Sequence, residues 1–235
     1  MGGGFGGFRK IDELIAVFPI DETEAAVAAS YPIAPSRRVL AIVRHQGKNR
    51  LKRLHWGLVP FWAKDTSMGQ RLINARAETV ATKPRFRNAF KHRRCLIPAD
   101  GFYEWQDEKG KKQPVYFTLP DSRPFAFAGI WERWDDRGNA DSIYLSCAII
   151  TTIASKSVAP VHHRMPVILN PGVYTTWLDP ENRNTRALET ILKTEIIGEL
   201  IYRPVSHQVN PTGDNSPGNI RPMAQMNLDF ESFVR

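Results

Sequence analysis

Between residues 38 and 152 the chain repeats one pattern, in which β-branched and aromatic runs are separated by Gly, Pro or Asp. Such runs are typical of β-strands, and the residues between them are typical of turns. No unit alternates strand and helix as a parallel α/β sheet would. We therefore expect an α+β fold, a single domain over residues 1–235, with a curved, β-barrel-like antiparallel sheet and peripheral helices. The predicted strands are 38–45, 53–60, 94–106, 113–119, 124–134, 143–152, 165–169 and 200–206.

Four helices are predicted at the periphery of this sheet. The first follows the glycine-rich start of the chain, and the second begins at Pro84. The third begins near Pro171, because proline is well suited to the first turn of a helix. The fourth has Asn184 as its N-cap. Their predicted inward-facing residues are Ile11, Leu14, Ile15 and Phe18, then Phe86 and Phe90, then Leu188, Ile191 and Leu192.

The composition indicates a chain with a packed core. Hydrophobic residues make up 42% of the 235 residues, no apolar run is long enough to span a bilayer, and no secretory signal is evident. Cys95 and Cys147 lie in apolar runs, so we expect two buried, reduced thiols in a cytoplasmic protein, associated with the nucleoid if bacterial. There is no CxxC motif and the six His are scattered, so we expect no metal and no other cofactor.

The positive charges of the chain are clustered. The formal net charge is +8, and residues 44–56 and 83–94 interleave Lys and Arg with aromatic residues. Phosphates bind Lys and Arg, and unstacked bases bind flat rings, so this pattern favours a nucleic-acid partner. The alternative is that both segments are solvated surface with core aromatics between the charges.

The segment "ADGFYEWQ" (99–106) carries the first candidate for chemistry. In a strand, Asp100, Phe102 and Glu104 share one face, and Tyr103 and Trp105 share the other. A Glu104 carboxylate buried among rings would have a raised pKa and would exchange protons near neutral pH. The alternative is a strand glutamate that is exposed or held in a salt bridge.

Two further segments carry polar groups suited to catalysis. "VHHRMPVIL" places His162 and His163 before a strand, and histidine is the usual proton carrier at physiological pH. "LINARAET" places Asn74, Arg76 and Glu78 at alternate positions, hence on one face if the segment is extended. An asparagine can hold an oxyanion and an arginine can bind a phosphate with two parallel hydrogen bonds. Each of these residues also has a purely structural interpretation.

Taken together and in order, these segments resemble the SOS response-associated peptidase (SRAP) family of abasic-site processing proteins. The resemblance covers about residues 31–222 and is carried by long blocks of unusual composition. These blocks are "WGLVPFWAKD", "INARAETVATKPRFRNAFKHRRCLIPADGFYEW", "KQPVYF", "FAFAGIWERW", "VHHRMPVIL" and "PVSHQVN". The resemblance implies a β-barrel-like domain with a cationic groove for single-stranded DNA or its junction with duplex. It also implies covalent capture of abasic sites, self-removal of the leading residue, and a monomer that does not bind membranes.

The resemblance assigns roles to particular residues. With the N-terminal residue after Met1, here Gly2, as nucleophile, it implies that Glu104 relays protons, His162 opens the sugar ring and Asn74 orients the reacting groups. Thr151 would line the same pocket. Arg76 would bind phosphate, Trp62 would stack on a base or wedge it, and Arg85 and Arg87 are further phosphate candidates.

The start of the chain, "MGGGFGGFRK", departs from the family pattern Met-Cys-Gly-Arg. Gly2 stands where the family has a thiol, and Gly4 stands where it has an arginine. The glycines indicate either a flexible leader over residues 1–10, with the core at about 11–222, or backbone that passes through a tight pocket. Without the thiol, the chain would form an imine through its amine, or would only bind DNA.

Overall fold

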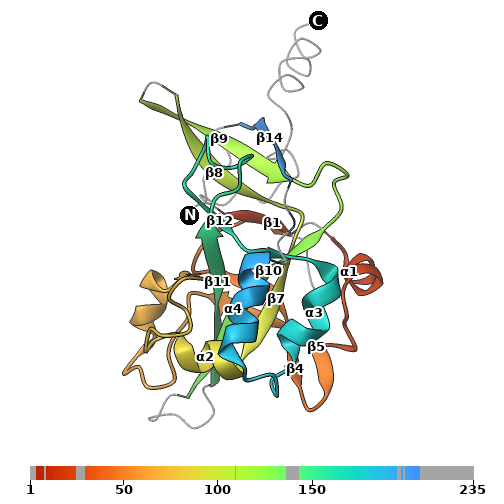
Figure 1. The fold of residues 1–235 in the computed structure, drawn as a ribbon, viewed down its shortest axis with the longest axis vertical. Coiled ribbons are helices and arrows are strands. Elements are labelled where there is room, and N and C mark those ends of the chain that lie inside the picture. The colour runs from red at the N-terminus through yellow and green to blue at the C-terminus, as the bar shows by residue number, and fades with distance from the viewer. Residues whose placement is uncertain are drawn as a thin grey trace, which may run out of the picture.

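Five strands pair into a closed ring at the centre of the structure, a computed structural model that describes residues 4–7, 9–24, 30–108, 110–135, 143–194, 197 and 199–206 (Figure 1). They pair in the order β4–β5–β11–β10–β7, and β7 pairs again with β4. The contact that closes the ring, between β5 and β11, is parallel, while the other pairings are antiparallel. The strands are β4 (Arg38–His45), β5 (Lys48–Trp56), β7 (Arg94–Ala99), β10 (Phe125–Asp135) and β11 (Ile143–Ile153).

Short strands extend the sheet beyond this barrel. β6 (Asn74–Arg76) continues the edge of β11 that β5 leaves, and β12 (Arg164–Pro166) continues the edge that β10 leaves. β11 therefore pairs with β5 and β10 along its first part and with β6 and β12 near its end. β2 (Glu22–Thr23) pairs with β5, and β13 (Ile168–Leu169) pairs with β10.

A second sheet of five strands lies beyond one end of the barrel, at the top of Figure 1. Its order is β14 (Ile201–Pro204), β9 (Lys111–Thr118), β8 (Gly101–Glu108), β1 (Phe5–Gly7) and β3 (Ser30–Ile33). β8 and β9 form a hairpin whose turn uses Gly110 at φ +84°. Gly101 lies close to the neighbouring strand, since a Cβ there would be 2.4 Å from the Phe117 carbonyl oxygen.

Successive side chains along the barrel strands point alternately into two hydrophobic cores. The inner core combines barrel residues with Phe5, Phe102 and Phe117 of the second sheet, so it joins the two sheets. Both cysteines, Cys95 and Cys147, are buried in it as free thiols, as the sequence predicts. Its barrel residues include Val39, Ala41, Val43, Leu54, Trp56, Ile97, Phe125, Phe127 and Ile149.

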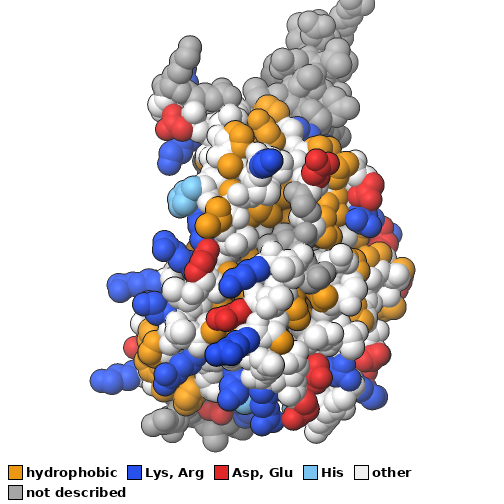
Figure 2. All heavy atoms as spheres, viewed as in Figure 1, with side chains coloured by type: hydrophobic (Ala, Val, Ile, Leu, Met, Phe, Trp, Pro, Cys, Tyr) orange, Lys and Arg blue, Asp and Glu red, His pale blue; other side chains and the backbone are white. Residues whose placement is uncertain are grey.

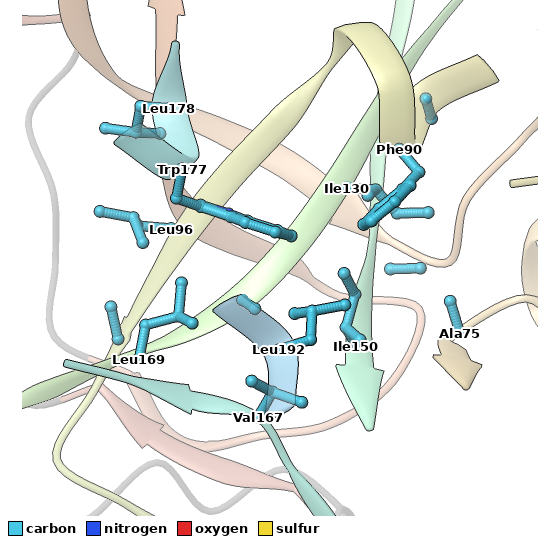
Figure 3. Close-up of a cluster of buried hydrophobic side chains, with 14 of the residues drawn as sticks. Ala75, Phe90, Leu96, Ile130, Ile150, Val167, Leu169, Trp177, Leu178 and Leu192 are labelled. Carbon is cyan, nitrogen blue, oxygen red and sulfur yellow. The ribbon is translucent and has the colours of Figure 1, made fainter. Parts of the chain in front are cut away.

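The outer core lies between the barrel and the helices. It contains Leu96 and Ile150 from the outward faces of the strands, packed with Phe90, Trp177 and Leu192 from the helices (Figure 3). The helices on this face are α2 (Arg87–His92), α3 (Tyr174–Leu178) and α4 (Thr185–Thr194) (Figure 1). The remaining helices are α1 (Ile11–Val17) and the 3-10 helices η1 (Thr66–Arg71) and η2 (Pro171–Val173). Within the described residues no helix is long and apolar enough to cross a membrane.

The predicted α+β architecture with a barrel-like sheet is confirmed, with local corrections. The predicted strand 53–60 runs instead from 48 to 56, and the segment 94–106 divides at Asp100 into β7 and β8. Ile15 is exposed rather than inward-facing. Of the predicted helical stripe, only Leu14 and Phe18 are buried. Glu78 lies in a turn after β6, so it does not share an extended face with Asn74 and Arg76.

Candidate functional site

The first described residues run along β8 toward Glu104. β1 is antiparallel to β8, with Gly6 opposite Gly101 and Phe5 opposite Phe102. The Gly4 carbonyl continues this ladder by accepting a hydrogen bond from the Tyr103 amide at 2.9 Å. Residues 5–7 are thus a strand between β8 and β3, with Phe5 buried. Gly2 itself lies outside the described residues.

Glu104 is a buried carboxyl group in the middle of β8. Its side chain is 2% exposed, and Oε1 has no hydrogen-bond partner among the residues that the structure describes. Burial raises the pKa of Glu104 to about 7, and the positive charge of the chain's amino terminus opposes this rise. At neutral pH the group is therefore divided between its acid and base forms, which suits proton transfer in both directions. The predicted burial of Glu104 is confirmed.

Two adjacent strands, β6 and β11, bring Asn74, Arg76 and Thr151 together. β6 runs parallel to β11, with Asn74 opposite Ile149 and Arg76 opposite Thr151. On its other edge, Thr151 is opposite Pro166 of β12. Thr151 is buried, Asn74 is half-buried and Arg76 is exposed. Solvent exposure therefore increases across these residues, from the buried Thr151 through Asn74 to the exposed Arg76.

His162 follows a turn and lies two residues before Arg164, at which β12 begins. Its Nδ1 is 2.9 Å from the Arg164 carbonyl oxygen and 3.0 Å from the Arg164 amide nitrogen. Its ring stacks on His163 with centroids 4.5 Å apart. Burial lowers the pKa of His162, the Arg164 backbone raises it, and the amino terminus and Arg164 lower it further. The imidazole is therefore mostly neutral at pH 7.

The amino terminus acts on both titratable candidates. Its positive charge lowers the pKa of Glu104, and it also lowers the pKa of His162. The same positive charge therefore opposes the effect of burial on the pKa of Glu104 and adds to the effect of burial on the pKa of His162.

The predicted DNA-contacting aromatic, Trp62, is 46% exposed and its neighbour Phe61 is 53% exposed. The turn that carries them is held at its base, where the Trp134 indole donates to the Ala63 carbonyl at 2.8 Å. This turn follows β5, which ends at Trp56. Both rings are therefore exposed on a turn that is anchored to β10.

The predicted phosphate ligands Arg85 and Arg87 are exposed at the start of α2. The Arg85 guanidinium lies 5.7 Å from the centre of the Phe86 ring, which is buried beneath it. Lys83 and Lys91 are exposed on the same segment. Figure 2, viewed from the same side as Figure 1, shows Lys and Arg side chains gathered over the lower part of the molecule. Within the described residues no cluster of His, Cys, Asp and Glu is suited to hold a metal ion.

Comparison with known proteins places this arrangement in a family. The sequence model of the SOS response associated peptidase (SRAP) family matches residues 1–212. The chain belongs to the SRAP family. It is 41% identical to the abasic site processing protein YoqW of Bacillus subtilis over 92% of this chain and 97% of YoqW. It is 31% identical to the abasic site processing protein HMCES of Gallus gallus, over 83% of this chain and 64% of HMCES.

A solved structure supports the same SRAP fold. A crystal structure of a protein from Bacteroides thetaiotaomicron matches with a TM-score of 0.79 and 24% identity, over 94% of this chain and 99% of that one. At this level of identity the likeness concerns the fold alone. It agrees with the closed barrel and the second sheet described above.

The sequence patterns of this SRAP protein did not reveal the interaction between Glu78 and Arg164. The two groups form a pair of hydrogen bonds of 2.6 and 2.9 Å, although 86 residues separate them. Both residues stand in segments that the sequence analysis singled out, but nothing in either segment indicates the pairing. Only the meeting of β6, β11 and β12 brings them together.

Proposed function

We propose that this protein binds single-stranded DNA and reacts covalently with abasic sites through its N-terminal amine. The main support is the register of β1 on β8. Phe5 lies opposite Phe102, and the carbonyl of Gly4, the first described residue, accepts a hydrogen bond from the amide of Tyr103, the residue next to Glu104. The names of the relatives, which are abasic site processing proteins, point to the same substrate.

The proposed reaction follows from the chemistry of an amine and an aldehyde. Once Met1 is removed, the Gly2 amine attacks C1′ of the ring-opened sugar and forms a carbinolamine, which loses water to give an imine. Glu104 is suited to protonate the departing hydroxyl and then to accept a proton, because its pKa is about 7. A neutral His162 is suited to take the proton from the sugar hydroxyl as the ring opens.

An α-amine suits this role better than a lysine would. Its ordinary pKa of about 7.7 to 8 leaves a useful neutral fraction at pH 7, whereas that of lysine is about 10.4. With glycine at position 2 there is no thiol to close a thiazolidine ring on the imine. The imine would then hydrolyse back to the aldehyde, or lose the C2′ proton and the 3′ phosphate by β-elimination and cut the strand.

DNA binding is proposed to use the exposed cations and aromatics. Arg76 lies at the solvent edge of the site, and Arg85 and Arg87 lie on the segment that follows it. Such groups bind backbone phosphates, while Trp62 offers a ring for stacking on an unpaired base. Self-removal of the leading residue is part of the same proposal, since the reaction needs a free Gly2 amine.

A second candidate is a DNA-binding module without chemistry. The absence of a thiol at position 2 favours it, because a stable product would then not form. The buried Oε1 of Glu104, which has no hydrogen-bond partner among the described residues, favours the covalent reaction instead, since burial of such a group without a partner costs stability.

Borohydride trapping on abasic single-stranded DNA separates these candidates. The protein, with loss of Met1 verified by intact mass, is incubated with the DNA in the presence and absence of borohydride. We expect a trapped adduct only with reductant, and a drop of about 100-fold in trapping for Glu104→Gln. The exposed Glu181→Gln serves as control.

Three other outcomes would contradict parts of the proposal. An adduct that survives heating without reductant would show that the link is more than an imine. Retarded DNA with no trapped adduct would favour the binding module. Equal trapping by wild type and Glu104→Gln would exclude Glu104 from proton transfer.

A further inference from the structure

The Arg164 backbone can hold His162 in each of its protonation states. Nδ1 of the ring lies within hydrogen-bond distance of both the amide and the carbonyl of Arg164. When Nδ1 carries no proton it accepts from the amide, and when it is protonated it donates to the carbonyl. Nε2 can therefore gain or lose a proton without rotation of the ring. The position of the ring depends on where the Arg164 backbone lies.

The Arg164 side chain donates hydrogen bonds to three oxygens of Glu78 and Thr151. One guanidinium nitrogen donates to Glu78 Oε1 at 2.6 Å, and the other donates to Glu78 Oε2 at 2.9 Å and to the Thr151 carbonyl at 2.7 Å. The arginine side chain is only 14% exposed. Hydrogen bonds from Arg164 lower the pKa of Glu78, so the carboxylate is ionised at neutral pH. Paired, charge-assisted bonds of this type are stronger and more directional than neutral ones.

Glu78 is itself held against the candidate site. The amide of Ala77 donates to the Thr151 carbonyl at 2.9 Å, and the amide of Val80 donates to the Arg76 carbonyl at 2.8 Å. The turn that carries Glu78 is thus attached to β11 and to the end of β6. Through Arg164, the same turn reaches the segment that carries His162.

We infer that Glu78 is a positioning residue, which fixes Arg164 and through the Arg164 backbone sets the His162 ring for the reaction at the abasic sugar. This inference rests on the proposed function for its chemical consequence. Its structural part, the dependence of His162 on Glu78, can be measured without DNA.

The competing interpretation treats Glu78 as a surface anion beside a DNA site, since its side chain is 43% exposed. The two interpretations predict opposite results for Glu78→Gln. Removal of a surface anion strengthens binding to phosphates, and it leaves the rate of adduct formation unchanged or increases it. Loss of a positioning group lowers the rate even when the DNA is fully bound, because misplaced catalytic groups react slowly.

The first experiment compares Glu78→Gln with Glu181→Gln, which removes the same charge from an exposed pair with Arg183. We expect Glu78→Gln to bind abasic DNA at least as tightly as wild type, yet to form the borohydride-trapped imine about tenfold more slowly at saturating DNA. Glu181→Gln should stay within about twofold of wild type in both. Circular dichroism verifies that both variants fold. A wild-type rate for Glu78→Gln at saturation would overturn the inference.

The second experiment follows the ring nitrogens of His162 by NMR during a pH titration of the free protein. The charged groups that act on this ring are His163 and Arg164 within the described residues, and the positive charge of the amino terminus. In Glu78→Gln the Arg164 charge loses its counterion and the backbone bond that raises the His162 pKa is weakened. Both effects move the midpoint of the His162 titration to lower pH.

The two measurements separate the inference from the proposed function. An unchanged His162 titration in Glu78→Gln would overturn the inference, even if the trapping rate fell. If wild-type protein gave no trapped adduct, the proposed function would fail, and the titration would still decide whether Glu78 positions His162.

Discussion

At the scale of single residues, Glu104 shows how a site residue can oppose stability. Its carboxyl is removed from water in β8, and Oε1 gains no hydrogen bond in return among the described residues. Burial therefore raises its pKa from an ordinary 4.5 to about 7. The folded state prefers the protonated form, so ionisation of this group destabilises the fold.

This preference predicts a pH-dependent stability. As the pH rises from about 4.5 to about 7, the unfolded chain loses the proton before the folded chain does, so the stability contributed by Glu104 is lost over that window. Glu104→Gln stays neutral and should exceed wild type at pH 8 by on the order of 3 kcal/mol. The difference should disappear below about pH 4.5. Urea unfolding at both pH values measures it, and an equal difference at both would contradict the assignment.

At the scale of elements, Arg94 holds the helices to the barrel. It begins β7, is buried, and donates to the carbonyls of Phe90 and Lys91 in α2 and of Trp177 in α3. It also donates to the Asp179 and Asn182 carbonyls just after α3. Burial lowers the pKa of Arg94 to about 10, so the group remains charged at neutral pH. One side chain thus satisfies carbonyls from two helix ends.

Replacement of Arg94 by methionine should destabilise the protein by about 3–5 kcal/mol, because several buried carbonyls lose their donor at once. Arg186→Met changes an exposed arginine of α4 and should shift stability by no more than about 0.5 kcal/mol. Thermal unfolding of both variants at pH 7 compares them. Equal melting temperatures would show that Arg94 does not hold the helices.

At the scale of the whole molecule, we expect the proposed binding to DNA to depend more on where the positive charges lie than on the net charge. Lys48 and Lys52 of β5 are paired with Glu22 and Glu24. Arg85 and Arg87 are exposed and have no carboxylate partner among the ion pairs of the described residues. Equal charges on the two surfaces therefore present different fields to DNA.

We predict that Arg85→Gln with Arg87→Gln weakens binding to single-stranded DNA and lowers the slope of log affinity against log salt by about 1.4. Lys48→Gln with Lys52→Gln removes the same net charge from paired positions and should change the slope much less. Fluorescence anisotropy at several salt concentrations measures both. Equal slope changes would mean that net charge alone governs binding.

The sequence by itself located the long strands β4, β9, β10 and β11 to within two residues, the buried faces of α2 and α4, and the residue types of the candidate site. Alternation places Phe102 in the inner core and Tyr103 outside it, as the pattern predicts, because a strand has a period of two. The capping of α4 by Asn184 likewise follows from local chemistry, and the Asn184 side chain accepts from the Ala187 amide.

Tertiary structure alone decided how these segments meet. The parallel contact that closes the barrel and the pairing of Glu78 with Arg164 join residues about 90 positions apart. Neither has a local signal, since a hydrogen bond between distant segments depends on the packing of the strands that carry them. The exposure of Ile15 has the same origin, because a stripe is buried only where another surface covers it.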